Sequence, residues 1–423
     1  MTWKPLLDGA QRDAALATVR DIALALCDPP PCSLVEDQSE QAARVTTASL
    51  SLGNAGLAVG FGYLALVHPH EPQYAAAARR LIAEAAAILG KEMMLPTLYG
   101  GFPGIAWALA MLRAWKIVAV SDQAFAAVDR ALLTYVDRDE PPDKVELIYG
   151  LAGCLVYSLA RLPNADALRF VELALRAFEA TAEKTRDGIT WFVPAEQLRS
   201  ATLLRAPEGC YNLGLSHGNP GVISVLAEIH RLGIDPPRTR RLLEESVRWL
   251  LAQELPSGRF PSLIGPGVDP KPARVAWCYG SPGVPIALLR AASALERDDW
   301  RESAIRLAGV AAETPFEESG VIDPPFCHGA VGLMHQFNRL YQDTGVPLFA
   351  DAARAWFERT LAYRVEGTGV AGFCSRSMPD EGSFDEPGML YGAAGVAVTF
   401  AAATSDVEPS WDAMFALSDA GTA

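Results

Sequence analysis

Gly53-Asn54-Ala55-Gly56-Leu57-Ala58-Val59 is a G-x-x-G motif that runs directly into apolar residues. The same pattern recurs six more times, with first glycines at Gly101, Gly150, Gly218, Gly280, Gly329 and Gly392. The intervals between first glycines are 48, 49, 68, 62, 49 and 63 residues. One such motif carries little information, but seven at similar intervals indicate a repeat architecture.

Two kinds of helix are expected to alternate along this repeat. The segment after each motif is apolar nearly all round, which predicts a buried inner helix. Helices with a polar face are expected between them, at residues 13–27, 76–89, 125–136, 167–184, 239–254, 300–313 and 349–363. The glycines would let the chain turn tightly into each inner helix at little steric cost. The alternation predicts an all-α fold, an α/α toroid of seven inner and seven outer helices, with an open helical solenoid as the alternative.

The whole chain, residues 1–423, is expected to form a single toroid domain. The three longer intervals carry irregular segments near 185–217, 255–278 and 364–390, and the first includes the β-like stretch Trp191-Phe192-Val193-Pro194. Each segment leads into a G-x-x-G motif, so we expect all three on one rim of the fold. Loops held on a rigid scaffold commonly carry binding and catalytic residues.

Composition excludes several classes of protein. The formal net charge of −14 argues against a nucleic-acid partner, which would favour a basic face. No apolar run is long enough for a membrane span. Asp13, Arg20 and Asp21 interrupt the N-terminal segment at helical spacing, so it does not read as a signal peptide. We therefore expect a cytoplasmic protein whose seven cysteines are thiols or metal ligands.

Chemically active residue types recur at fixed positions relative to the motif. One residue before the first glycine stand Tyr149, His217, Tyr279, His328 and Tyr391. Two residues before it stand Cys278 and Cys327. If the repeats close into a ring, these side chains converge at one end of its axis. Two thiols and the imidazole of His328 would bind zinc and leave one position open, as in catalytic zinc sites.

Each of these residues also has a structural interpretation. A cysteine in an apolar repeat is often only a small buried hydrophobe, and His217 could serve a structural hydrogen bond. The other cysteines have no histidine at repeat spacing and are expected to be core thiols, loop thiols or incidental: Cys27, Cys32, Cys154, Cys210 and Cys374. His335 lies inside a predicted helix, in the core or at the surface.

At this level of detail the chain resembles the lanthionine synthetase C-like (LanC-like) family from the first repeat to Trp411-Asp412. The motifs that carry the resemblance are Ser216-His217-Gly218-Asn219-Pro220-Gly221, Arg274-Val275-Ala276-Trp277-Cys278-Tyr279-Gly280 and Cys327-His328-Gly329. The resemblance implies an α/α toroid with zinc held by Cys278, Cys327 and His328.

The same resemblance implies a catalytic group around that zinc. His217 matches the family's acid/base, while Arg274 and Tyr279 match residues of the active site. The family usually has aspartate four residues before the third motif, where this chain has Glu146. Glu146 is expected either to hold His217 or to act as a cap or ion-pair partner.

The implied function is that of a zinc-dependent lanthipeptide cyclase. Such an enzyme adds cysteine thiols to dehydroalanine or dehydrobutyrine of a precursor peptide (leader plus core), forming (methyl)lanthionine thioether rings. The chain has no dehydratase-like region, so a separate dehydratase is expected as a partner.

Three alternatives remain open. The protein could add an external thiol such as glutathione to dehydrated peptides. It could be a non-catalytic, zinc-bearing scaffold that binds peptides. By fold analogy alone it could be a glycosidase or a zinc prenyltransferase, for which the acidic loop Asp380-Glu381…Asp385-Glu386 would offer carboxylates.

Overall fold

The computed structural model describes residues 2–30, 39–376 and 382–420. Its backbone contacts divide the chain into two compact units. Unit 1 comprises Met1–Val128, Val321–Met414 and Ala420–Ala423, and unit 2 comprises Asp129–Gly320 and Phe415–Asp419. That all 423 residues form one domain stays a prediction.

The predicted alternation of two kinds of helix is confirmed. Seven helices within the described residues follow the motifs and are largely buried: α3 (Asn54–Val67), α5 (Phe102–Ala114), α7 (Leu151–Ala160), α10 (Asn219–Arg231), α12 (Gly283–Leu295), α15 (Ala330–Thr344) and α17 (Ala393–Thr404). Seven amphipathic helices alternate with them: α1 (Gly9–Leu26), α4 (Pro72–Ala86), α6 (Ala126–Val136), α8 (Ala165–Thr181), α11 (Pro236–Leu251), α13 (Asp298–Ala312) and α16 (Pro347–Ala362).

Three of the early helix starts have a simple cause. Helices α4, α11 and α16 begin two to four residues earlier than predicted, at Pro72, Pro236 and Pro347. Proline suits the first helical position because its φ is already helical and its missing N–H is not needed there. Hydrophobic periodicity does not detect such starts, since the proline precedes the first buried residue of the pattern.

Short elements fill the irregular segments. The helices are α2 (Glu40–Ala48), α9 (Ser200–Leu203) and α14 (Phe316–Ser319), with 3-10 turns η2 (Asp122–Ala124), η3 (Ala195–Gln197) and η4 (Ser410–Phe415). Strands β1 (Glu183–Thr185) and β2 (Gly188–Thr190) form one hairpin, and β6 (Ser375–Arg376) and β7 (Ser383–Phe384) form another. Strands β3 (Phe192–Val193), β4 (Cys210–Asn212) and β5 (Leu263–Ile264) form an antiparallel sheet. Strand β3 confirms the predicted extended stretch near Trp191.

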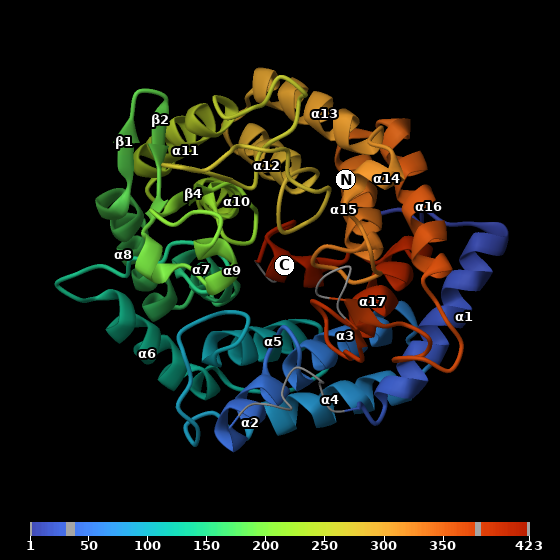
Figure 1. The fold of residues 1–423 in the computed structure, drawn as a ribbon. Helices are drawn as coiled ribbons and strands as arrows, with labels where there is room; N and C mark the ends of the chain where they lie inside the picture. Colours follow the sequence, from blue (N-terminus) through green and yellow to red (C-terminus); the bar gives the residue numbers. More distant parts are fainter. Residues whose placement is uncertain (1, 31–38, 377–381, 421–423) are drawn as a thin grey trace. The chain divides into compact units, whose positions relative to one another are not determined.

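In unit 1 each inner helix packs on an outer one. Helix α3 packs on α4, α15 on α16 and α17 on α1, and α17 lies between α15 and α3 (Figure 1). The last repeat therefore packs directly against the first.

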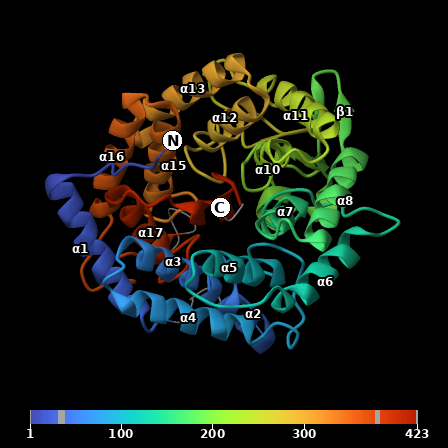
Figure 2. The same ribbon diagram turned by 180° about the vertical axis from the view of Figure 1, so that it is seen from behind.

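Unit 2 repeats the same two-layer packing. Helix α7 packs on α8, α10 on α11 and α12 on α13, and α10 lies against both α7 and α12 (Figure 2). No helix within the described ranges combines the length and the apolar character needed to cross a bilayer.

The glycines of the motif are required by a close backbone contact. Six of the seven first glycines cap their helices with extended backbone rather than with a positive φ, which only Gly280 has (+75°). A Cβ on Gly104 would lie 1.8 Å from the carbonyl oxygen of Leu98, six residues earlier. A Cβ on Gly332 would lie 1.9 Å from the carbonyl oxygen of Phe326. The loop before each helix folds back onto its first turn, and only glycine leaves room for it.

Backbone hydrogen bonds link the equivalent loop residues of neighbouring repeats. In unit 1 the N–H of Cys327 donates to the carbonyl of Leu390 (3.0 Å), that of Leu390 to Ser51 (3.0 Å), and that of Ser51 to Tyr99 (3.1 Å). All four residues stand two before the first glycine of their motif. In unit 2 the Ser216 N–H donates to the carbonyl of Cys278 across 3.4 Å. Residues that align in the sequence repeats are therefore also hydrogen-bonded neighbours in the structure.

Replacing Gly104 with alanine should therefore destabilise the protein, by about 1–3 kcal/mol, because the new methyl group overpacks against a fixed backbone carbonyl. The matched control is Gly100→Ala, where a Cβ meets no atom within 4 Å. Urea unfolding of both variants checks this. Equal midpoints for the two would contradict the close-contact explanation.

A buried ionic cluster holds helix α15 to the C-terminal turn in unit 1. His335 Nε2 lies 2.7 Å from Asp412 Oδ2, and Arg339 Nη2 lies 2.7 Å from the same oxygen. Burial lowers the pKa of His335, although Asp412 opposes the shift. His335 Nδ1 is buried and has no hydrogen-bond partner among the described residues, so a second ring proton would find no acceptor. His335 is therefore neutral in the folded chain.

This burial predicts loss of stability in acid. Below a pH of about 6.5 the unfolded chain binds a proton at His335 that the folded chain does not, so stability falls as pH falls, by up to about 1.4 kcal/mol per pH unit. In His335→Gln, which cannot titrate, the decline between pH 7 and 5 should be shallower than in wild type. Urea midpoints across this range test the prediction, and identical slopes would overturn it.

Candidate active site

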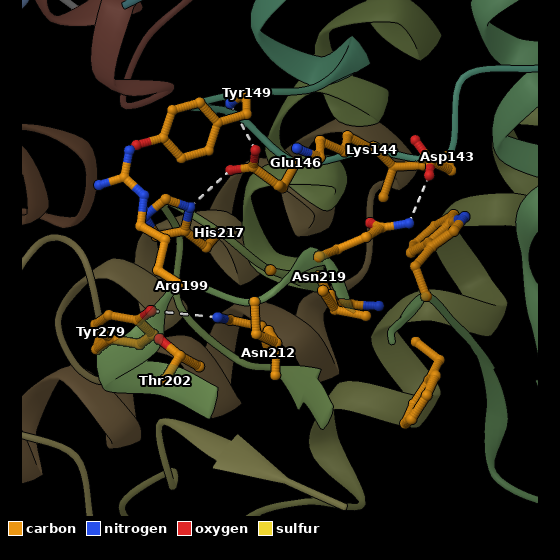
Figure 3. A pocket seen from close by; sticks show the side chains of 17 residues that line it. Asp143, Lys144, Glu146, Tyr149, Arg199, Thr202, Asn212, His217, Asn219 and Tyr279 are labelled. Carbon is orange, nitrogen blue, oxygen red and sulfur yellow. Dashed lines mark hydrogen bonds and ion pairs between the residues drawn. The ribbon is translucent and has the colours of Figure 1, made fainter. Parts of the chain in front are cut away.

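Three aromatic side chains of unit 2 converge beside the N-termini of neighbouring inner helices. Tyr149 precedes α7, His217 precedes α10 and Tyr279 stands in the loop before α12. The rings of Tyr149 and His217 stack with centroids 5.7 Å apart, and those of His217 and Tyr279 are 6.4 Å apart (Figure 3). Within this unit, residues at the position before the first glycine meet as the repeat alignment predicts.

Glu146 binds His217 directly. Its Oε2 lies 2.9 Å from His217 Nδ1 (Figure 3) and also accepts the Ile148 N–H across 2.9 Å, while its Oε1 accepts the N–H of Tyr149. Two backbone donors stabilise an acceptor-only carboxylate. Nδ1 of His217 then carries a hydrogen, and Nε2 is left to exchange protons. Glu146 thus both holds His217 and caps its own loop.

These residues line a pocket of about 820 Å³, counting the space open to solvent. Its lining also includes apolar side chains, those of Val145, Trp191, Phe192, Val193 and Leu198. Glu146 is nearly buried, whereas the His217 side chain is one-third exposed (33%). The pocket therefore joins a reachable imidazole to an apolar surface. Of the three long loops expected near the site, the one near 185–217 supplies most of the lining.

Two cations line this pocket, and neither was anticipated from the sequence. The Arg199 guanidinium lies 4.7 Å from the centre of the Tyr149 ring, and Lys144 Nζ lies 6.0 Å from it. Burial raises the pKa of Tyr149, with Arg199 opposing, so Tyr149 is a neutral phenol at neutral pH. Arg199 lies on an irregular segment outside the repeat register, which explains why no sequence signal pointed to it.

Asn212 fixes the hydroxyl group of Tyr279. Its Nδ2 donates to Tyr279 Oη across 3.2 Å (Figure 3), and its Oδ1 accepts the Gly214 N–H across 2.9 Å. Asn212 stands six residues before Gly218 at the end of β4. A signal existed in the sequence, because polar residues occupy the same register position elsewhere, in Asp323 and Glu386.

Arg274 lies elsewhere in the same unit. Its side chain is exposed and is not among the residues that line the described pocket. Its backbone carbonyl lies close to Gly280, and its Cβ lies close to Gly320. The catalytic assignment of Arg274 stays a prediction.

The three predicted zinc ligands are distributed over both units. Cys278 belongs to unit 2, and Cys327 and His328 belong to unit 1. Both cysteine side chains are buried, each only 6% exposed. Across the described ranges, no group of three or more His, Cys, Asp or Glu is placed to hold a metal ion. The zinc site therefore stays a prediction.

The other thiols fit the structural role expected for them. Burial raises the pKa of Cys154 to about 12 and that of Cys210 to about 11, so both remain protonated. Cys374 is partly buried in a loop and Cys27 is exposed. Cys32 lies outside the described residues.

Comparison with solved structures defines the fold. The chain superimposes on nisin cyclase with a TM-score of 0.73 at 18% sequence identity, over 96% of this chain and 98% of that one. Nisin cyclase is an α/α toroid. The predicted fold class is therefore confirmed, and the open solenoid is excluded.

Comparison with curated proteins gives two relatives. The nisin biosynthesis protein NisC of Lactococcus lactis subsp. lactis is 26% identical over 277 residues, which are 57% of this chain and 61% of NisC. Glutathione S-transferase LANCL1 of Danio rerio is 29% identical over 135 residues, 32% of each chain. Both matches span less than two thirds of the relative's length.

The family model described as "Lanthionine synthetase C-like protein" matches residues 44–416, nearly the whole repeat region. This match covers all seven G-x-x-G motifs together with Glu146, His217, Cys278 and the Cys327-His328 pair. The chain belongs to the lanthionine synthetase C-like family.

Proposed function

We propose that this protein is a zinc-dependent lanthipeptide cyclase that closes thioether rings in a dehydrated precursor peptide. The observation that carries the proposal is the Glu146–His217 pair in a partly open pocket lined by both polar and apolar side chains. Family membership supports the same reaction, as do two similar proteins named for nisin biosynthesis and nisin cyclisation. The precursor peptide, a separate dehydratase and a cytoplasmic location are parts of this proposal.

The reaction is an addition that needs no oxidant or reductant. The S–H bond of a peptide cysteine breaks, and the C=C bond of a dehydro residue becomes a single bond. Sulfur bonds to the β-carbon, and a proton is delivered to the α-carbon. The protein must therefore present a thiolate, stabilise an enolate and donate a proton on the correct face.

Cys278, Cys327 and His328 are the residues we propose to hold zinc. Two buried cysteine thiols and an imidazole are the donor types of a catalytic zinc site and would leave one position open. Zinc bound there would lower the pKa of a substrate thiol and so supply the thiolate. The remaining steps fall to side chains of the pocket.

His217 is proposed to protonate the α-carbon. Protonated at both nitrogens, it can give up the hydrogen on Nε2 while Nδ1 stays bonded to Glu146. The Glu146 carboxylate would balance the charge of the imidazolium, and the stacked Tyr149 would restrict the tilt of its ring. Tyr279 follows the ligand Cys278 directly, and with its hydroxyl held by Asn212 it would orient the bound peptide.

Stabilisation of the enolate requires a positive charge near the peptide carbonyl. Arg274, which matches an active-site arginine of the family, is one candidate for this role, although its side chain is exposed and does not line the described pocket. Arg199 and Lys144 line the pocket beside Tyr149. We propose Arg199 as a second candidate for this role.

A second candidate function is addition of an external thiol, since one relative is named a glutathione S-transferase. A zinc-bearing scaffold that only binds peptides is the non-catalytic alternative. The glycosidase and prenyltransferase alternatives rest on fold analogy alone, and Asp380 and Glu381 of the acidic loop lie outside the described residues.

Mass spectrometry distinguishes these functions. A synthetic peptide with one cysteine and one dehydroalanine should keep its mass but lose reactivity toward a thiol-alkylating reagent when the protein closes the ring. Added glutathione should not increase the peptide mass. Cys278→Ala, or removal of zinc by a chelator, should reduce ring closure to the uncatalysed rate, and zinc should restore the chelated wild type.

Other outcomes would decide against cyclisation. A mass increase by one glutathione would identify external thiol addition. An unchanged, fully alkylatable peptide would indicate a scaffold or a different reaction. Wild type purified without chelator and free of zinc would contradict the zinc dependence.

Variants of the acid/base pair test the mechanism. His217→Asn should lower kcat by about 10²- to 10⁴-fold, since general acid catalysis typically contributes that much. Glu146→Gln should also lower kcat, whereas Glu146→Asp, the residue usual in the family, should retain most activity because the carboxylate is preserved. Single-turnover ring closure at equal zinc content measures all three.

Full activity of zinc-loaded His217→Asn would remove this histidine from the mechanism. Arg274→Gln and Arg199→Gln in the same assay decide between the two cations. The residue that stabilises the enolate should affect kcat more than KM.

A further inference from the structure

We propose that Asp323 is the positioning residue for His328, holding its ring so that Nδ1 is the nitrogen that binds metal. This inference rests on the proposed zinc site and adds a residue to which neither family resemblance nor the sequence pattern gives a role. Asp323 opens the loop before α15, six residues ahead of Gly329, and is 1% exposed. Both residues belong to unit 1.

The loop of Asp323 differs from equivalent loops in a way that redirects its carboxylate. Asn212 and Glu386 occupy the same register position, and each accepts the backbone N–H two residues further on, from Gly214 and Gly388. After Asp323 that position is Pro325, which has no N–H. The turn that binds the other two side chains therefore cannot form.

The Asp323 carboxylate turns instead toward the proposed ligand and toward strand β6. Its Oδ2 accepts the Arg376 N–H across 2.9 Å and lies 3.5 Å from His328 Nε2. The ring of Tyr391 lies against His328, with centroids 5.6 Å apart. These contacts restrict the His328 side chain, which is only 12% exposed.

The surroundings of Nε2 specify where the ring carries its hydrogen. Nε2 lies 3.4 Å from the carbonyl oxygen of Arg376, in addition to Asp323 Oδ2. A lone pair would be repelled by two oxygen atoms, whereas an N–H can donate to them. The hydrogen is therefore on Nε2, and the lone pair that can bind a cation is on Nδ1.

This arrangement is the one that metal-binding histidines ordinarily use. Their second nitrogen donates to a carboxylate or a backbone carbonyl, which sets the tautomer and makes the ligand more basic. Here both kinds of acceptor face the same nitrogen. Burying a carboxylate without a partner of this kind costs free energy. If the side chain at this position only had to accept the Arg376 N–H, an uncharged amide would serve equally well.

Asp323→Asn separates these two roles, because an amide oxygen can keep the bond to Arg376 while the charge is lost. We expect zinc affinity, measured by competition with a chromophoric chelator, to fall by about 10- to 100-fold. The matched control is Asp129→Asn, which removes another buried carboxylate, bonded to Tyr157 and Arg161 in unit 2. The control should lower thermal stability and leave zinc affinity unchanged.

A second variant tests the same idea without touching Asp323. Pro325→Ala restores a backbone N–H at the position used in the equivalent loops, so it should draw the carboxylate away from His328. We expect a smaller but measurable loss of zinc affinity. Selective ¹⁵N labelling of histidine in the metal-free protein should show His328 as the Nε2–H tautomer in wild type, with this preference weakened in both variants.

The outcomes separate this inference from the proposed function. Wild-type zinc affinity in Asp323→Asn and Pro325→Ala would overturn the role of Asp323 and leave the cyclase proposal intact. An equal loss of affinity in Asp129→Asn would attribute the effect to general destabilisation and overturn it as well. A wild type that binds no zinc would overturn both proposals.

Discussion

The close approach between each G-x-x-G motif and the loop before it is the constraint on which the rest of the structure depends. The loop carbonyl six residues before the second glycine occupies the space where a Cβ would be, as at Gly104 and Gly332. Each loop is thereby held against the first turn of its inner helix. A residue at a given distance before the motif takes the same place in every such repeat, and backbone hydrogen bonds between repeats then keep these loops in register.

Because the repeats are held in a fixed register, residues at equivalent sequence positions are brought close together in space. In unit 2 it brings Tyr149, His217 and Tyr279 together, and in unit 1 it brings His328 to Tyr391. None of these pairs is close in sequence. Because the scaffold is made of buried helices, the loops can carry polar groups without being responsible for the stability of the fold.

Chemical differences arise where single loops depart from the common pattern. The Glu146 carboxylate accepts hydrogen bonds from two backbone amides of its own loop and also binds the imidazole of His217. Pro325 removes a donor and so frees Asp323 for His328. In both cases one carboxylate accepts backbone N–H groups and also lies beside the imidazole of a histidine.

The sequence by itself determined the alternation of helices, the seven-fold repeat and the residues that share a register position. These features depend on local rules, the 3.6-residue period and the steric need for glycine, which do not require knowledge of distant contacts. Only the tertiary structure decided that Glu146 bonds Nδ1 of His217, that Arg199 and Asn212 join the pocket, that Arg274 stands outside it and that Asp323 faces His328. Those contacts join side chains on long irregular loops, whose backbone conformation no hydrophobic period predicts. The direction of each polar side chain there depends on which hydrogen-bonding groups of its neighbours still need a partner.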